Sequence, residues 1–550
     1  MTMSTTQATE PQRGSQDCNP AVLVGALVVV AIGAGVISCF PVEDWISTFG
    51  IGDAYIYQRV AFNVAHGLGS TYSLLTPTNG YHPLCMWLQV PIFLGSEDIL
   101  SRLPVLMKVW ALFCLLAACV WGLLVQRLTR NSFAAALMSI QVGLFGWSIF
   151  VLYSGMETPV ALLLLGLAYW FAQGVREAEN ARRALGQLFF YALFGALCFL
   201  SRLDLFFLLL PSLWIAWPGL ARAGTRGIIL ALAVGLILVL PYLWWNAAAF
   251  GGVMPVSGFV KTHEELGFSH SMRAVSAWLF RMRILDSSGA LIAMGALAIL
   301  AVVAMIPLVP FMRRRFGDFG RLLTCCLVGA AAQYLYYLGF IRETNVPWHL
   351  YPQFLMFYLV MSAAFLFGVS LFHKARAARS RRLLVSGSVF AVFLIPLICL
   401  TVGYAAIKQV RQVEKRTTIE VAKWIARSIP RDQPIAMYDS FVPAIFNPRH
   451  AFVDLNGLVG DRHGAELVKA GKLQELMSRH WCQYWIVHLH GSGAFSASGW
   501  TLNKEFRYRL KGKEQRIMVL RREDNRPAPW PGHISKVSLA NPLINAATMS

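Results

Sequence analysis

Apolar stretches long enough to cross a lipid bilayer recur along most of the chain, and they constrain its fold more than any other feature. A hydrocarbon core about 30 Å thick needs about 20 apolar residues per helix. Charged residues make up 14% of the 550 residues, against about 25% in soluble proteins. The sequence therefore predicts a polytopic α-helical membrane protein with about 11 transmembrane helices. The candidate spans are 21–40, 103–125, 133–152, 158–174, 186–201, 204–217, 227–246, 288–311, 322–341, 349–371 and 383–406.

The charges between these spans predict how the chain is oriented. Arginine and lysine favour the cytoplasmic side of a membrane, and basic clusters such as 313–315 fall in alternate connections. Those connections are therefore predicted to be cytoplasmic. The N-terminus, with a polar disordered tail over 1–20, then lies in the cytoplasm. The transmembrane region covers 21–408, and the remaining chain, 409–550, is extracytoplasmic.

The overall charge and the cysteines exclude two other kinds of partner. The net charge of +20 does not indicate nucleic acid, because the basic residues lie in short clusters between apolar spans. The ten cysteines show no metal-ligand spacing, and most lie in apolar stretches. A small buried hydrophobe is the ordinary interpretation of such a cysteine.

Ionisable and aromatic residues gather in the opposite, outer connections. The largest of these is the first outer loop, 41–102, which is polar although it lies between two apolar spans. Ionisable groups at membrane depth are costly and usually face a cavity or a partner. Five connections contribute such groups, which predicts one shared cavity that opens to the outer face. The candidate residues are Asp44, Asp53, Arg59, Asn79, Tyr81, His82, Glu157, Arg202, Asp204, Ser257, Lys261, Arg342, Trp348 and His349.

Structural roles compete with functional ones at several of these positions. Glu157 and Asp204 are also suited to a structural ion pair with Arg202 or Arg342. The interfacial aromatic residues are typical of the belt at a membrane surface. Asp53 precedes a helical pattern and is therefore also a candidate for its N-cap.

The chain after the last span has the composition of a soluble domain. Residues 409–550 contain charges throughout and no apolar stretch of spanning length. Helical spacing over 417–430 and 464–477 alternates with short β-like runs, which predicts a small α/β domain. Cys482 is its only cysteine, so no disulfide is expected within the domain. The expected strands are 434–438, 451–455, 484–489 and 516–520.

Several motifs of the outer connections occur together, and in order, in a known family. The first loop contributes Asp53, Tyr55, Ile56, Arg59, Asn63, Gly67, Gly69, Gly80, Tyr81, Pro83, Leu84 and Trp87. Later elements are Ser-Gly-Met-Glu-Thr (154–158), Ser-Arg-Leu-Asp (201–204) and Asp-Leu-Asn-Gly-Leu (454–458). This combination resembles the GT-C glycosyltransferases, and more narrowly the cell-wall arabinofuranosyltransferase branch and its relatives. The first loop of that family starts with two aspartates, and the first of them is replaced here by Gly52.

The resemblance implies a GT-C-like fold and transfer of a sugar, arabinofuranose being one candidate, from a polyprenyl-phosphate donor. The acceptor would be a glycan, glycolipid or glycoprotein at the outer face of the bacterial cytoplasmic (inner) membrane. Transfer to a hydroxyl needs a carboxylate that accepts the proton, for which Asp53 is the first candidate and Asp44 the second.

The donor phosphate needs positive charge, and the candidates for this role are Arg202, Lys261 and Arg342. Arg59 is placed among the sugar- or acceptor-binding residues, with structural support of the loop as its alternative role. The remaining residues proposed to bind sugar or acceptor are Asn79, Tyr81, His82, Glu157, Asp204, Ser257, Trp348 and His349.

No cofactor is required in this interpretation. A divalent cation held by Asp44, Asp53 and Glu157 is an alternative, but cations of the protein can neutralise the phosphate. Two other functions also stay open, a secondary transporter and a non-catalytic envelope assembly factor. A transporter would be expected to show internal repeats and polarity near the midplane, whereas the polar residues here lie towards one face.

Overall fold

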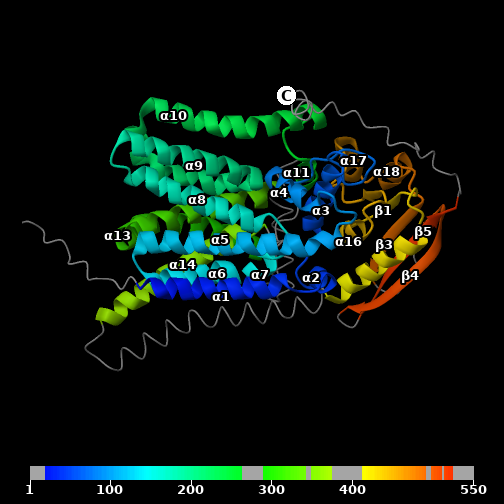
Figure 1. Cartoon of the computed structure of the whole chain (residues 1–550), viewed down its shortest axis with the longest axis horizontal. Helices are drawn as coiled ribbons and strands as arrows, with labels where there is room; N and C mark the ends of the chain where they lie inside the picture. The colour runs from blue at the N-terminus through cyan, green and yellow to red at the C-terminus, as the bar shows by residue number, and fades with distance from the viewer. Residues whose placement is uncertain are drawn as a thin grey trace, which may run out of the picture.

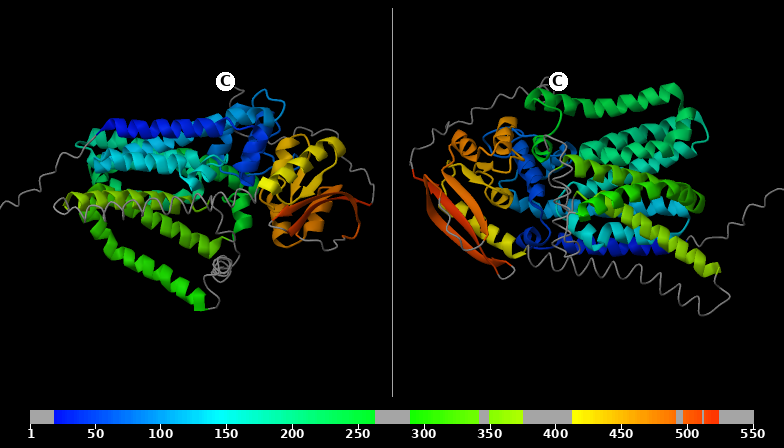
Figure 2. Two further views of the ribbon diagram at one scale, coloured as in Figure 1. Left: turned by 90° about the horizontal axis from the view of Figure 1, so that it is seen from below. Right: turned by 180° about the vertical axis from the view of Figure 1, so that it is seen from behind.

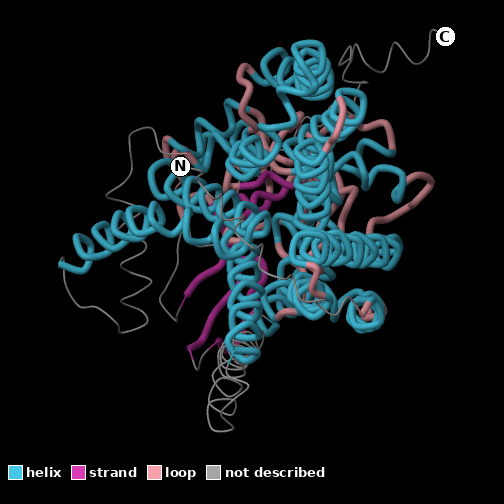
Figure 3. The backbone as a smooth tube through the Cα atoms, turned by 90° about the vertical axis from the view of Figure 1, so that its left-hand side faces the viewer, coloured by secondary structure: helices cyan, strands magenta, loops and turns pink. Residues whose placement is uncertain are grey.

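The computed structural model has a bundle of long helices with a smaller domain of strands and helices at one end (Figure 1). The structure describes residues 19–262, 289–341, 349–374, 412–490, 497–510 and 513–523. Figure 3 looks along the bundle, so that many of its helices appear nearly end-on with the strands behind them. The polytopic helical architecture and the C-terminal sheet domain predicted from the sequence are thus confirmed.

The bundle is built from the apolar segments that the sequence singled out. Each predicted span from 21–40 to 349–371 falls on helix, whereas 383–406 lies outside the described residues. By length and composition, six of the described helices can cross a membrane, and the total of eleven crossings stays a prediction. The bundle helices are α1 (Pro20–Ser38), α5 (Leu103–Thr129), α6 (Ser132–Leu144), α7 (Gly146–Leu152), α8 (Thr158–Glu177), α9 (Ala181–Ser201), α10 (Phe206–Phe250), α13 (Gly289–Phe340) and α14 (Tyr351–Lys374).

Two of these helices each contain two predicted spans. Both α10 and α13 are interrupted by a glycine in the left-handed backbone region, Gly224 (φ 65°) and Gly317 (φ 56°). Glycine adopts this conformation without a steric penalty, so the chain can turn back there (Figures 1 and 2). In α10 the turn returns the chain to the sheet-domain end, because residues just before and just after this helix line the same cavity.

The predicted span 133–152 is not a single helix. It divides into α6 and α7, because Phe145 between them has an extended backbone (φ −67°, ψ 146°). The second part of α10 also differs from a core helix, since Ile229, Leu232, Ile237 and Trp244 are all exposed. An exposed surface this apolar is suited to contact with lipid.

The first outer loop folds into helices that lie between the bundle and the sheet domain. These are α2 (Val42–Thr48), α3 (Gly52–Ala65) and α4 (Pro83–Phe93). The N-cap of α3 is Ile51, and Asp53 lies in the first turn without a capping hydrogen bond. The interpretation of Asp53 as an N-cap is therefore wrong, and its side chain is directed to a lysine, as described below.

The C-terminal domain contains one five-stranded mixed sheet, in the order β2-β1-β3-β5-β4. The strands β2, β1 and β3 are parallel, and β5 pairs antiparallel with both β3 and β4. Helices separate the parallel strands, as parallel pairing requires. The strands are β1 (Ile435–Met437), β2 (Phe452–Asp454), β3 (Tyr484–His490), β4 (Trp500–Leu510) and β5 (Lys513–Arg522), and the helices are 412–428, α16 (Phe441–Phe446), α17 (Arg462–Lys469) and α18 (Leu473–Arg479).

Two elements of this domain differ from the prediction. The helix expected over 464–477 is two helices, because Gly471 between them has a positive φ of 70°. The edge strand β4 was not predicted, since its sequence is rich in charged residues and its first half is exposed. Charged residues on an edge strand are common because they oppose pairing with other chains.

Arg59 joins the first outer loop to the sheet domain. Its Nε donates to the backbone oxygen of Tyr72 in the loop at 2.6 Å. Its Nη atoms donate to backbone oxygens of the sheet domain, those of Ala444, Asn447 (3.2 Å) and His450 (2.6 Å). The guanidinium is fully buried, and this burial lowers its pKa to about 10.

The same interface contains two close backbone approaches. A Cβ on Gly80 would lie 1.9 Å from the backbone oxygen of Leu458, and a Cβ on Gly52 would lie 2.6 Å from the ring of Phe441. Bundle, loop and sheet domain also share one continuous cluster of buried apolar residues. The sheet domain is therefore packed against the loop rather than tethered to it.

Replacing Arg59 should weaken the whole interface. In Arg59→Met, buried carbonyl groups lose their donors, and an unsatisfied buried group costs about 1–3 kcal/mol. We expect a loss of about 2–4 kcal/mol in the free energy of unfolding, measured as a fall of several degrees in the unfolding temperature of the purified protein. Arg416→Met is the matched control, because Arg416 also joins the two parts but is mostly exposed, and it should leave the unfolding temperature unchanged.

Candidate active site

A cavity of about 400 Å³ lies where the end of the bundle meets the first outer loop and the sheet domain. Separate stretches of the chain contribute to its wall, including α3, the start of α8, the α9–α10 connection, α11 (Val256–Lys261) and the end of α13. Nine of the residues singled out in the sequence line it: Asp53, Tyr81, His82, Glu157, Arg202, Asp204, Ser257, Lys261 and His349. The structure therefore brings most of the predicted candidates to one place.

Asp53 and Lys261 form an ion pair in the wall of this cavity. The Nζ of Lys261 lies 3.3 Å from the Oδ2 of Asp53, and the two side chains are 16% and 20% exposed. Asp53 comes from the first turn of α3, and Lys261 is the last residue of α11. The carboxylate and its counter-ion thus come from elements about 200 residues apart in the sequence.

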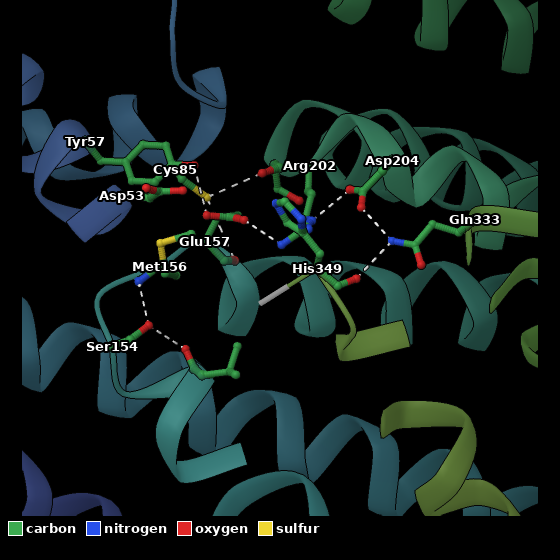
Figure 4. A network of polar contacts seen from close by, with 12 residues as sticks. Asp53, Tyr57, Cys85, Ser154, Met156, Glu157, Arg202, Asp204, Gln333 and His349 are labelled. Carbon is green, nitrogen blue, oxygen red and sulfur yellow. Dashed lines mark hydrogen bonds and ion pairs between the residues drawn. The ribbon is translucent and has the colours of Figure 1, made fainter. Parts of the chain in front are cut away.

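A second group of charges is buried deeper (Figure 4). Arg202 donates through Nη1 to Glu157 at 2.8 Å and through Nε to Asp204 at 2.7 Å. The hydroxyl of Tyr57 donates to the other oxygen of Glu157 at 2.9 Å, and that of Tyr337 donates to Asp204 at 2.6 Å. Because a buried charge is costly unless paired and hydrogen-bonded, this network holds both carboxylates in place as hydrogen-bond acceptors.

The structural ion pairs that the sequence offered as an alternative role for Glu157 and Asp204 are thus present, since both carboxylates pair with Arg202. The same carboxylates also line the cavity. Pairing with Arg202 and contact with a ligand are therefore compatible, because a carboxylate offers about four acceptor positions.

His82 and Tyr81 line the wall formed by the first loop. The His82 ring stacks on Tyr57, with centroids 6.5 Å apart and planes 21° from parallel. Burial lowers the pKa of His82, so the ring is neutral near pH 7 and can accept or donate one hydrogen bond. The Tyr81 hydroxyl lies 2.6 Å from the Oγ of Ser70, which fixes its orientation.

The wall on the bundle side is largely apolar. It includes Phe199, Leu203, Phe206 and Phe207 around the α9–α10 connection, and Tyr336 on α13. Phe206 is about half exposed, so this wall continues to the outer surface of the bundle. The cavity therefore has a charged side near the loop and an apolar side near the membrane-spanning helices.

Several predicted site residues lie elsewhere. Asp44 is exposed and pairs with Arg416 at 3.8 Å, and Arg59 is enclosed in the interface described above. Asn79 donates through Nδ2 to Asn246 at 3.1 Å and accepts from the backbone N–H of Val256 at 2.9 Å. Its position is structural, because it fixes the start of α11. Arg342 and Trp348 lie outside the described residues.

The sequence analysis did not assign a role to three residues that donate hydrogen bonds to the cavity carboxylates, namely Tyr57, Gln333 and Tyr337. Tyr57 follows Asp53 by four residues on α3, which places both on one helix face. This spacing in the sequence could therefore have identified Tyr57 as a neighbour of the carboxylate. Gln333 donates to Asp204 at 2.8 Å, and Tyr337 is one turn further along α13. Both occur within an apolar span, where a polar residue is a sign of function or internal pairing.

The carboxylates considered for a divalent cation are not assembled. Asp44 does not line the cavity. Within the described residues, no three His, Cys, Asp or Glu side chains are arranged to hold a metal ion.

A buried carboxylate of the sheet domain supports the cavity from the other side. Asp454 accepts hydrogen bonds from the backbone N–H groups of Asn456 (3.3 Å) and Leu458 (3.0 Å). Leu458 lines the cavity and packs against Gly80. Burial raises the pKa of Asp454 to about 7, so the charge on this side chain changes near neutral pH.

Comparison with solved structures supports the predicted fold. No protein-family profile and no curated protein matches the chain. Among solved structures, the chain is similar to ArnT from Cupriavidus metallidurans in the apo state, with 12% identity and a TM-score of 0.51 over 90% of this chain and 98% of ArnT. ArnT bound to undecaprenyl phosphate is similar at 11% identity, with the same TM-score and coverage.

This similarity extends over nearly the whole length of both proteins. It shows that the chain has the overall membrane fold of ArnT. At this low identity the similarity concerns the fold alone. The narrower resemblance to the arabinofuranosyltransferase branch stays a prediction.

Asp454 should make stability depend on pH. Its folded-state pKa of about 7 exceeds the value of about 3.9 expected for an unfolded chain, so the folded protein binds more protons between about pH 4 and 7. Its free energy of unfolding should therefore fall as pH rises through this window. Asp454→Asn cannot ionise, so its unfolding temperature relative to the wild type should rise between pH 4.5 and 7.5.

Asp461→Asn provides the control for this measurement. Asp461 pairs with Arg479 at 2.7 Å, and hydrogen bonds from this arginine help to hold its pKa below the usual value. Asp461 therefore stays ionised across the window, and the variant should differ from the wild type by a constant amount. A constant difference for Asp454→Asn as well would contradict the assignment.

Proposed function

We propose that this protein is a membrane glycosyltransferase that moves a sugar from a polyprenyl-phosphate donor to an acceptor of the cell envelope. The observation that carries the proposal is one cavity with a carboxylate–lysine pair on one side and an apolar wall on the other. A lipid-linked sugar has the same division, because its tail is apolar and its phosphate and sugar are polar. The similarity in fold to ArnT, one structure of which contains undecaprenyl phosphate, supports the same class of donor.

The donor is placed by the two sides of the cavity. Its tail follows the apolar surface formed by Phe206, Phe207 and Tyr336 towards the lipid around the bundle. Its phosphate lies at Lys261, with Arg342 as a further candidate. Arg202 is already engaged by two carboxylates, so we assign it the role of holding Glu157 and Asp204 in position.

Asp53 is the proposed general base. The acceptor hydroxyl oxygen attacks the anomeric carbon of the donor sugar and its proton passes to Asp53. The bond between that carbon and the phosphate oxygen breaks, and polyprenyl phosphate leaves with the bonding electron pair. General-base catalysis of this kind contributes about 10²–10⁴-fold to a rate. Asp44 is not assigned this role, because it does not line the cavity and its exposed carboxylate pairs with Arg416.

The sugar and acceptor hydroxyls are assigned to the remaining polar lining. Glu157 and Asp204 accept hydrogen bonds from hydroxyl groups, and the neutral His82 ring can donate or accept. Ser257 on α11 and His349, two residues before α14, complete the lining. The acceptor reaches the cavity from the side of the sheet domain, which we place outside the bacterial inner membrane. Arabinofuranose is the sugar favoured by the sequence resemblance.

The proposal can be tested without knowing the sugar. Deleting the gene should remove one sugar residue from the glycans or glycolipids of the envelope, detected by mass analysis. Expression of the wild type should restore it. Asp53→Asn should lower transfer by about 10²–10⁴-fold, and should therefore fail to restore the sugar although the variant is present in the membrane.

Asp44→Asn is the matched control, because it removes the same charge from the same loop outside the cavity. It should restore the missing residue as well as the wild type does. Envelope glycans that are identical with and without the gene would refute the proposal. Restoration by Asp53→Asn would remove Asp53 from the mechanism.

A further inference from the structure

We infer that Lys261 exchanges partners during the reaction: it holds Asp53 in the ligand-free protein and moves to the donor phosphate when the donor binds. The inference rests on the proposed function and adds that donor binding regulates the general base, Asp53. Donor binding would release Asp53 from its counter-ion, so that the base becomes available only when the sugar to be transferred is in place.

The charges of the cavity favour such an exchange. Among the lining residues that the structure describes, Asp53, Glu157 and Asp204 are acidic, whereas Arg202 and Lys261 are basic. A donor phosphate adds further negative charge to a wall that already has an excess of it. Each of the two described cations is paired with a carboxylate, so a phosphate that binds to either of them competes with its present partner.

Lys261 is better suited to move than Arg202. Arg202 is nearly inaccessible and is held by two carboxylates at 2.8 and 2.7 Å. Removing one partner from a buried charge pair is strongly destabilising. Lys261 has one described carboxylate partner, at the longer distance of 3.3 Å, and is partly exposed to the cavity. Its ammonium is at the end of a flexible four-carbon chain.

The backbone near Lys261 is held in place, so the exchange requires only its side chain to move. Asn79 fixes the start of α11 through the N–H of Val256. The ring of Phe259 contacts two cations of α17, with Arg462 at 3.5 Å and Lys469 at 4.3 Å from its centroid. Cation–π contacts of this kind stabilise by about 0.5–2 kcal/mol.

Asp53 remains stabilised as a carboxylate after the lysine has left. It lies in the first turn of α3, where unpaired N–H groups and the helix dipole favour negative charge. The helix terminus therefore supplies part of the stabilisation that the lysine gave to this carboxylate. Pairing with Lys261 occupies one of its oxygens in the ligand-free protein, which restricts proton abstraction before the donor is bound.

The exchange predicts that removing the base improves binding of the lipid phosphate. Undecaprenyl phosphate is the probe, and its dissociation constant is measured with the full-length protein in nanodiscs. In Asp53→Asn, Lys261 no longer has to leave a carboxylate, so the probe should bind about 5- to 10-fold tighter, a coupling within the usual range. Asp53→Ala should give the same gain. Lys261→Gln should bind more weakly than the wild type.

The double variant separates partner exchange from simple repulsion between Asp53 and the phosphate. Exchange requires Lys261, so adding Asp53→Asn to Lys261→Gln should change the dissociation constant by less than about twofold. If Asp53→Asn tightened probe binding equally in the wild type and in Lys261→Gln, the cause would be repulsion between Asp53 and the phosphate. That result would overturn the inference. Asp44→Asn removes a carboxylate of the same loop outside the cavity and should leave binding unchanged.

The remaining outcomes distinguish the inference from the proposed function. If the wild type binds undecaprenyl phosphate but neither Asp53 variant binds it more tightly, the exchange is wrong and the glycosyltransferase proposal stands. If the wild type does not bind the probe at all, both are wrong.

Discussion

The buried guanidinium of Arg59 is the interaction on which the arrangement of this protein depends. It donates to carbonyl groups of both the first loop and the sheet domain. A charge can be buried in this way only where every donor finds an acceptor, so the contact permits one relative position of the two parts. That position sets α3 against the bundle, with Asp53 in the cavity wall and Leu458 opposite Gly80. The geometry of the cavity is therefore a consequence of a contact that does not touch it.

The charged network at the cavity is likewise held in one arrangement by its buried hydrogen-bond partners. Glu157 comes from the connection before α8, and Arg202 and Asp204 come from the connection between α9 and α10, while Tyr57 and Tyr337 complete their hydrogen bonds from two helices. Buried ion pairs add little net stability, because desolvation offsets their attraction. Their value here is in orientation, since each carboxylate has one geometry in which all its partners are satisfied. The surrounding apolar residues supply the stability, and the network supplies the arrangement of acceptors.

Much of this protein could be predicted from its sequence because the underlying signals are local. A run of apolar residues of spanning length predicts a helix without knowledge of its neighbours, and the described spans fall on helix accordingly. Costly polar residues at the ends of these runs identified nine of the residues that line the cavity. Other signals were overridden by contacts between distant residues. Asp53 has the pattern of an N-cap, but its side chain pairs with Lys261, and Asn79 holds α11 instead of lining the cavity.

The sequence by itself determined the membrane class, the helical segments, the α/β character of the C-terminal region and the outer connections that hold the polar residues. Only the tertiary structure decided which of these residues meet. Arg59 and Arg202 look alike in the sequence, since both are arginines in the outer connections. One joins two domains through backbone carbonyls and the other pairs with two carboxylates at the cavity. The reason is physical: the partner of a buried charge is chosen by packing across the fold, and residues up to about 390 positions apart supply it.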